Sequence, residues 1–369
     1  MKKKILSLLL LLLVALPAIA DVVKVPYSRE LYEKAVMGDG EAMFQLSVCY
    51  MNGNGVAADY DKSDYWLERA AQEGQPNAMA AISAMRGRTG LSDAKRCELA
   101  AEEKRERERL EKERGSTIDP IDGSQTFTVG GVSFTMVNVE GGTFTMGATS
   151  EQGSDAYSDE KPAHSVTLSS YYIGQTEVTQ ELWEAVMGNN PSHVKGAKYP
   201  VDVSSWSQCQ EFISKLNKMT GKNFRMPTEA EWEFAARGGN KSHGYKYSGS
   251  NNIDNVAWYW RNSGNQRLNG TWDIEIIEKN KCQIHAVATK MPNELGIYDM
   301  SGNVDEYCSD WYSSYSYDSQ VNPKGPGSGD KHVSRGGFSR GLEKDSRVSD
   351  RHTCRPDQIL DPHGLRLAL

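Results

Sequence analysis

An acidic turn near residue 300 is the segment of this sequence whose residue types best suit metal chemistry. Asp299 and Glu306 are seven residues apart, with a glycine and an asparagine between them. Such a turn can fold around a hard cation, because its carboxylates and backbone carbonyls supply the oxygen ligands that calcium prefers. The alternative is a hydrogen-bonded turn that holds no metal.

Aromatic side chains that could bind a ligand are concentrated in and beside two loops. Tyrosine and tryptophan in such places stack on sugars or anchor peptides. The residues are Trp258, Tyr259, Trp260, Trp311, Tyr312, Tyr315 and Tyr317. For Trp258 and Trp311 we favour the alternative of a place in the core, whereas the run 312–319, rich in serine and tyrosine, is expected to be exposed.

Other chemistries find little support in the residues. The seven histidines show no HExxH spacing, and the sequence has no Walker loop and no nucleophile elbow. The six cysteines include no CxxC pair, so in an oxidising compartment they are expected to form disulfides or to be buried, with Cys49–Cys97 as one candidate bond. The formal net charge of −7 argues against nucleic acid as the main partner.

The amino terminus has the pattern of a signal peptide, which we assign to residues 1–20. Lysines at positions 2–4 precede an apolar run at 5–16 and a small-x-small cleavage site at 18–20. We expect cleavage before Asp21 and export to the periplasm or the extracellular space. An uncleaved membrane anchor is the alternative, but the apolar run is short for a span, and no later segment is apolar enough to cross a bilayer.

Residues 21–100 contain an internal repeat. A shift of 36 residues aligns six residues, from Leu31 to Ser47, with identical ones, which predicts a repeated hairpin of helices at about 42–51 and 60–73. This stretch resembles the Sel1-like repeat, a relative of the tetratricopeptide repeat, through residues 53–56 and 70–74. The resemblance implies a module that binds a protein or peptide partner. A small helical cap is the alternative, because few repeats build little concave surface.

A charged segment follows, and we assign residues 101–120 to a helical linker. All but one of the residues 102–114 are charged, and pairs such as Glu103 with Arg107 support a solvated helix that needs no core. Gly115 and Pro120 then favour a domain boundary near residue 120.

Residues 121–369 are predicted to form an α+β domain. Strand-like runs at 132–139 and 165–168 alternate with turns, and helices are expected at about 180–187 and 205–220. Ordered motifs in this domain resemble the formylglycine-generating enzyme (sulfatase-modifying factor) family. They include residues 142–147, 225–233, 301–304, 335–337 and 364–367. The resemblance implies a divergent C-type-lectin-like fold.

The resemblance also implies a catalytic site that this sequence lacks. Enzymes of the family oxidise a cysteine of a client sulfatase to formylglycine, using two cysteines that hold Cu(I) shortly after the Gly-Gly turn. Here Gly341 and Ser346 stand at those positions, and Cys354 is single and lies too far along. Because Cu(I) needs soft thiolate ligands, we expect neither copper nor this activity. Phe338 in place of serine and Asp305 in place of tryptophan are further departures beside the site.

Structural calcium is a further implication of the resemblance. The residues that would hold the ion by side chains or backbone carbonyls are Asp299, Gly302, Val304 and Glu306. A second calcium site would start at Asn255 and Val256, although its other half falls in residues 274–284, which depart from the family pattern.

The segment after Gly337 is expected to form the ligand-binding face. In the family it lines the site, and its many charges would be costly to bury, so most must face solvent or a partner. The predicted binding residues are Phe338, Arg340, Leu342, Glu343, Lys344, Asp345, His352 and Arg355, with Tyr315 and Tyr317 at the rim.

Three functions follow from this reading, and none has an assigned catalytic residue. The first is an exported, non-catalytic member of the family that binds protein or glycan at the lectin-like face and a protein partner through its helical repeats. The second is an oxidase of the formylglycine-generating type or an otherwise remodelled enzyme. The third is a structural component of an envelope complex.

Overall fold

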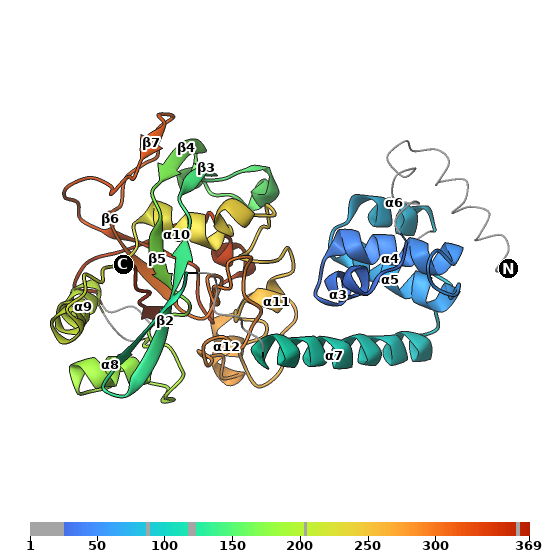
Figure 1. The fold of residues 1–369 in the computed structure, drawn as a ribbon, viewed down its shortest axis with the longest axis horizontal. Coiled ribbons are helices and arrows are strands. Elements are labelled where there is room, and N and C mark those ends of the chain that lie inside the picture. Colours follow the sequence, from blue (N-terminus) through green and yellow to red (C-terminus); the bar gives the residue numbers. More distant parts are fainter. Residues whose placement is uncertain (1–25, 86–88, 117–122, 203–204, 359–361) are drawn as a thin grey trace. The chain divides into compact units, whose positions relative to one another are not determined.

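The computed structural model describes residues 26–85, 89–116, 123–202, 205–358 and 362–369. The expected signal peptide and its cleavage site lie outside these residues. The chain divides into two compact units, Met1–Ile118 and Asp119–Leu369 (Figure 1). Among the described residues, no helix combines the length and the apolarity that crossing a bilayer requires.

Helices make up the described part of the first unit. They are α3 (Arg29–Val36), α4 (Gly40–Asn52), α5 (Tyr60–Gln72), α6 (Pro76–Ala84) and α7 (Asp93–Ser116). The hairpin of α4 and α5 agrees with the prediction to within two residues. The side chain of Asp39 caps α4 by accepting a hydrogen bond from the Ala42 amide, and Gly53 ends the helix in the left-handed conformation. Trp66 and Leu67 of α5 lie in the shared core.

The helix α7 starts earlier than the charge pattern predicted and is partly buried. Leu99 lies in the helical core, and Glu103 is only 6% exposed. Glu103 binds Arg69 and, at 2.7 Å, Arg107, and it accepts a hydrogen bond from the Tyr65 hydroxyl. The expectation of a helix that needs no core is therefore wrong for this part of α7, because α5 supplies a tertiary partner for its charge.

Three small sheets form the second unit. The first has the order β1 (Gln125–Val129), β2 (Val132–Val139) and β5 (Tyr171–Gly174), with antiparallel pairing throughout. The second has the order β3 (Gly142–Met146), β4 (His164–Leu168) and β7 (Gln320–Val321), so that β4 pairs with both other strands. The third has the order β10 (His363–Gly364), β6 (Asp305–Trp311), β8 (His332–Arg335) and β9 (His352–Cys354). This mixture of sheets and helices confirms the α+β class.

Helices of the second unit pack with the sheets around hydrophobic clusters of buried side chains. α8 (Gln180–Met187) and α9 (Trp206–Thr220) lie together at one end, as Figure 1 shows. α10 (Glu229–Ala236) packs against β3, β4, β6 and β8, and its Trp232 is fully buried. Two short helices, α11 (Ile253–Val256) and α12 (Ile274–Lys279), precede β6, and a 3-10 turn, η4 (Glu343–Ser346), lies between β8 and β9.

Candidate functional site

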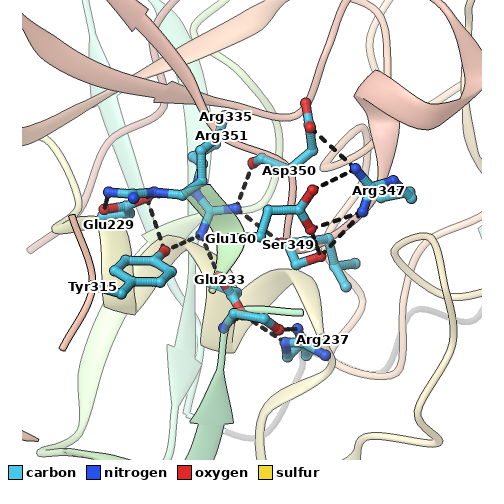
Figure 2. Close-up of polar contacts among 12 residues, drawn as sticks. Glu160, Glu229, Glu233, Arg237, Tyr315, Arg335, Arg347, Ser349, Asp350 and Arg351 are labelled. Carbon is cyan, nitrogen blue, oxygen red and sulfur yellow. Dashed lines mark hydrogen bonds and ion pairs between the residues drawn. The ribbon is translucent and has the colours of Figure 1, made fainter. Parts of the chain in front are cut away.

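A buried network of arginines and carboxylates lies beneath the segment that follows β8 (Figure 2). Arg335, at the end of β8, is fully buried and contacts two glutamates of α10. Its Nε lies 3.1 Å from Glu229, and its terminal nitrogen donates to Glu233. It also donates to the backbone oxygens of Val348 and Asp350. One side chain thus ties α10 to the carboxy-terminal segment.

Arg347 forms the second part of the network. Both its terminal nitrogens donate to Glu160, at 2.6 and 2.8 Å, and both side chains are fully buried. Ser349 Oγ and the Tyr157 amide also donate to this carboxylate. Burial opposes its ionisation, but these donors outweigh burial and hold the pKa of Glu160 below its ordinary value.

Arg351 completes the network through a bidentate pair with Glu229, at 2.6 and 2.9 Å. Its guanidinium lies 3.9 Å from the centre of the Tyr315 ring, and the Tyr315 hydroxyl donates to the same glutamate. Tyr315, which we expected in an exposed run, is therefore packed into the network. Tyr317 is 87% exposed, as that expectation requires.

The charges of the carboxy-terminal segment are divided between two environments. Arg347, Asp350 and Arg351 are buried, which corrects the expectation that most charges here face outward. Their burial is tolerated because each is paired with a charge on another part of the domain or segment. The predicted binding residues Phe338, Arg340, Leu342, Glu343, Lys344, Asp345 and His352 are half-buried, and Arg355 is exposed.

Residues 338–345, which we call the binding segment, are held in place from two sides. The Trp272 indole donates to the backbone oxygen of Arg340 at 2.9 Å, and Trp260 and Arg261 donate to the Glu343 carboxylate. On the other side the Tyr157 hydroxyl donates to Asp345. The ion-pair network lies beneath. A surface fixed in this way binds a ligand with little ordering cost.

An exposed apolar patch that the sequence reasoning missed lies beside the binding segment. Trp272, Ile274 and Ile276 are 43–44% exposed, and we call them the α12 patch. The same short helix directs Ile277 inward, into a core cluster against which Leu342 packs. The signal was present in the sequence as apolar residues on both sides of a short helix, but we read residues 274–284 only as a departure from a calcium site.

The residues expected to hold calcium lie in different surroundings. Asp299 is buried beside Glu177, and burial, which is the main cause, raises the pKa of Asp299 to about 6. Glu177 Oε2 accepts no hydrogen bond from the described residues. Both oxygens of Glu306 receive donors, from Arg366 and from the Trp232 indole. Asp299 and Glu177 thus have capacity for a cation, whereas Glu306 is already neutralised by Arg366.

The backbone conformation of this turn requires glycine at position 302. Gly302 has φ +76, and a Cβ at this position would lie 2.4 Å from the Trp258 backbone oxygen. Val304 is buried on the same turn, and Asn255 and Val256 lie buried at the end of α11. No side-chain ligand set forms around α11 among the described residues.

Thiol chemistry has no support in the described residues of the second unit. Gly341 and Ser346 stand where a cysteine pair would be needed, and the Ser346 hydroxyl is buried without a hydrogen-bond partner among the described residues. Burial raises the pKa of Cys354 to about 12 and that of Cys308 well above its ordinary value, so neither is a thiolate at neutral pH. The structure contains no disulfide, so the candidate Cys49–Cys97 bond is not formed.

A cavity of about 480 Å³ borders the ion-pair network, and Glu229, Tyr315 and Arg351 form part of its lining. The lining also includes His164, Asp310 and Trp311. Asp310 Oδ2 accepts hydrogen bonds from the Glu229 amide and from Ser309. Burial, with the charge of Glu229 as second cause, raises the pKa of Asp310 from 3.8 to about 7.

The raised pKa of Asp310 predicts that Asp310→Asn changes the stability of the protein in a pH-dependent way. The folded state binds the proton more tightly than the unfolded chain, so Asp310 destabilises the fold progressively as pH rises from 3.8 to about 7. Asparagine keeps the acceptor and has no charge. The melting temperature of the variant, relative to the wild type, should therefore be higher at pH 8 than at pH 5. The exposed Asp318→Asn is the control, and a pH-independent difference for Asp310→Asn would contradict the assignment.

Two family models match this chain. The model of the sulfatase-modifying factor enzyme 1-like domain matches residues 130–369, and that of the Sel1 repeat matches residues 40–75. Chaperone protein LppX of Paenibacillus barcinonensis is 42% identical over 215 residues, which cover 49% of this chain and 73% of LppX. The formylglycine-generating enzyme of Thermomonospora curvata is 31% identical over 202 residues, 50% of this chain and 60% of the enzyme.

A solved structure supports the fold. The variable protein 1 of Treponema denticola superposes with a TM-score of 0.57 at 34% identity, covering 67% of this chain and 98% of that one. The lectin-like domain is thus similar to proteins named as an enzyme, a chaperone and a variable protein.

Proposed function

The chain belongs to the family of sulfatase-modifying factor enzyme 1-like domains, and from this premise we propose that it is an exported, non-catalytic member that binds polypeptide at the binding segment and the α12 patch. Export is supported by the signal-peptide pattern of residues 1–20. The family includes proteins of different function on one fold, so the function must be argued from the site.

The observation that carries the proposal is the α12 patch. Trp272, Ile274 and Ile276 are exposed within five residues of the sequence, next to a segment held rigidly by buried ion pairs. Exposed large apolar side chains that lie near one another can mark interaction sites, and tryptophan is prominent among residues that anchor protein partners. Aliphatic isoleucines favour a polypeptide over a glycan. The similarity to LppX, which is named as a chaperone, is consistent with binding of a protein client.

A binding screen tests this function. Full-length protein is presented to a phage-displayed library of random peptides and to an array of bacterial glycans. We expect selection of peptides with apolar anchors. Selection of glycans alone would contradict the polypeptide assignment, and recovery of one stoichiometric partner in a pull-down would instead favour a structural role in an envelope complex.

The helical unit is proposed to dock a protein partner. Sel1 repeats generally mediate protein interactions, and the match covers residues 40–75. Deletion of the helical unit should leave peptide binding by the lectin-like unit intact, because each unit has its own core.

Absence of oxidase activity is a direct prediction from the missing thiols. Purified protein should neither bind Cu(I) tightly nor convert a sulfatase-type cysteine peptide to formylglycine, because Gly341 and Ser346 offer no thiolate. Competition with a Cu(I) chelator and mass spectrometry of the peptide measure the two properties, with a formylglycine-generating enzyme as positive control. Copper-dependent turnover would overturn the non-catalytic assignment.

Structural calcium remains a prediction with a defined test. If an ion sits between Asp299 and Glu177, it relieves the repulsion of two buried carboxylates. Calcium should then raise the melting temperature of chelator-treated protein, and Asp299→Asn should abolish this increase. The exposed Asp318→Asn, which should keep the increase, is the control. An identical melting temperature with calcium and with chelator would exclude a structural role.

A further inference from the structure

Three side chains with metal-ligand atoms converge above the ion-pair network. His352 lies on β9, Asp350 just before it, and Asp345 in the 3-10 turn η4. One ligand atom from each lies within 4.8 Å of the other two. His352 Nε2 and Asp350 Oδ2 are 3.0 Å apart. Two ligands of a tetrahedral zinc ion lie about 3.3 Å apart at bond lengths of about 2.0–2.1 Å, so this pair is close to that spacing.

Asp305 fixes the orientation of the imidazole from the opposite side. His352 Nδ1 lies 2.9 Å from Oδ2 of Asp305, which is on β6, and β8 lies between β6 and β9 in the sheet. Ser334 donates to the same oxygen, which holds the carboxylate in place. A carboxylate that accepts a hydrogen bond from one ring nitrogen of a histidine leaves the other nitrogen for a metal, and this arrangement is the usual outer shell of metal-binding histidines.

The carboxylates keep lone pairs for a metal. Asp350 Oδ2 has His352 as its hydrogen-bond partner, while Oδ1 lies 3.2 Å from Arg347. Each oxygen of Asp345 accepts one hydrogen bond, from Tyr157 and from the Leu342 amide. Arg347 also pairs with Glu160, so its charge is shared between Glu160 and Asp350. His352 and Asp345 are half-buried, so an ion can enter from solvent.

We propose that Asp345, Asp350 and His352 bind one zinc ion, with Asp305 as the positioning residue for His352. One imidazole nitrogen and two carboxylate oxygens are a ligand set that zinc accepts, whereas calcium takes oxygen ligands alone. Three protein ligands leave a fourth position open to water or to a group of a bound ligand. The site includes Asp345, the last residue of the binding segment, and does not depend on what the rest of that segment binds.

Zinc binding to the full-length chain tests the proposal. Chelator-treated protein is titrated calorimetrically with zinc, and Co²⁺ is added separately because its visible absorption reports nitrogen and oxygen ligation. We expect one tight equivalent. Asp345→Asn and His352→Gln should each lower the affinity at least tenfold, and Asp305→Asn about tenfold to a hundredfold. The control is His243→Gln, because His243 Nδ1 lies 3.6 Å from Glu294 in a similar histidine–carboxylate pair outside the cluster.

Circular dichroism checks that each variant is folded. If His352→Gln fails to fold, zinc binding by Asp345→Asn tests the proposal instead. The side chain of Asp345 is half-buried and does not belong to the buried ion-pair network, so this variant is expected to fold. Absence of a tight zinc equivalent would overturn the proposal, as would equal affinities of Asp345→Asn and the wild type. Displacement of zinc by equimolar calcium would also overturn it. Calcium takes oxygen ligands alone, so a site that prefers calcium would not use the imidazole of His352.

Discussion

Replacement of Arg347 by methionine is expected to lower the free energy of unfolding of the carboxy-terminal unit by about 3–5 kcal/mol. The substitution leaves Glu160 fully buried and charged with only Ser349 and a backbone amide as donors. For a domain of this size the loss corresponds to a fall of about 6–20 °C in melting temperature, measured by calorimetry or circular dichroism.

Lys344→Met is the matched control for this prediction. Lys344 is three residues away in the same segment, and its ammonium lies over the Tyr157 ring in contact with solvent. Its loss should leave the melting temperature almost unchanged. If Arg347→Met were as mild as the control, the ion pair with Glu160 would not anchor the binding segment.

Loss of the α12 patch should abolish most of the affinity for a selected peptide without unfolding the protein. Trp272→Ala and Ile276→Asp are each expected to weaken binding about 30-fold or more, because buried anchors of an interface contribute at least about 2 kcal/mol each. An aspartate at position 276 lies in the first turn of α12, where the helix dipole favours negative charge. Fluorescence polarisation with the labelled peptide measures the affinity.

Met219→Asp is the control for the effect of placing a charge on an exposed apolar residue elsewhere on the surface. Met219 is 52% exposed on α9 and does not contribute to the α12 patch. The variant should bind the peptide as the wild type does. Equal weakening by Met219→Asp and Ile276→Asp would contradict a localised binding surface.

The elements that were predicted well carry their own local signals. α8 has the predicted bounds because Thr179 caps its amino terminus and Gly188 ends it in the left-handed conformation. The buried face of α9 was also predicted, since Cys209, Phe212 and Leu216 follow helical spacing and are all buried. These features depend on neighbours within one or two turns.

Contacts between distant residues account for what was missed. Arg347 and Arg351 were read as charges of an exposed segment, because their partners Glu160 and Glu229 lie more than a hundred residues earlier. Asp305 was noticed only as a departure from the family pattern. Nothing in the sequence indicates that its carboxylate contacts His352, because the two residues lie on strands β6 and β9, which pair with opposite sides of β8. The α12 patch was missed for a different reason, since a short apolar run does not reveal which of its side chains a fold leaves exposed.

Hydrogen–deuterium exchange with a selected peptide tests the central claim most directly. The full-length protein is compared with and without saturating peptide. Protection is expected in residues 338–345 and in residues 270–279 around α12, and it should disappear in the Ile276→Asp variant. Protection confined to the helical unit, or unchanged protection in that variant, would contradict a polypeptide-binding surface on the lectin-like domain.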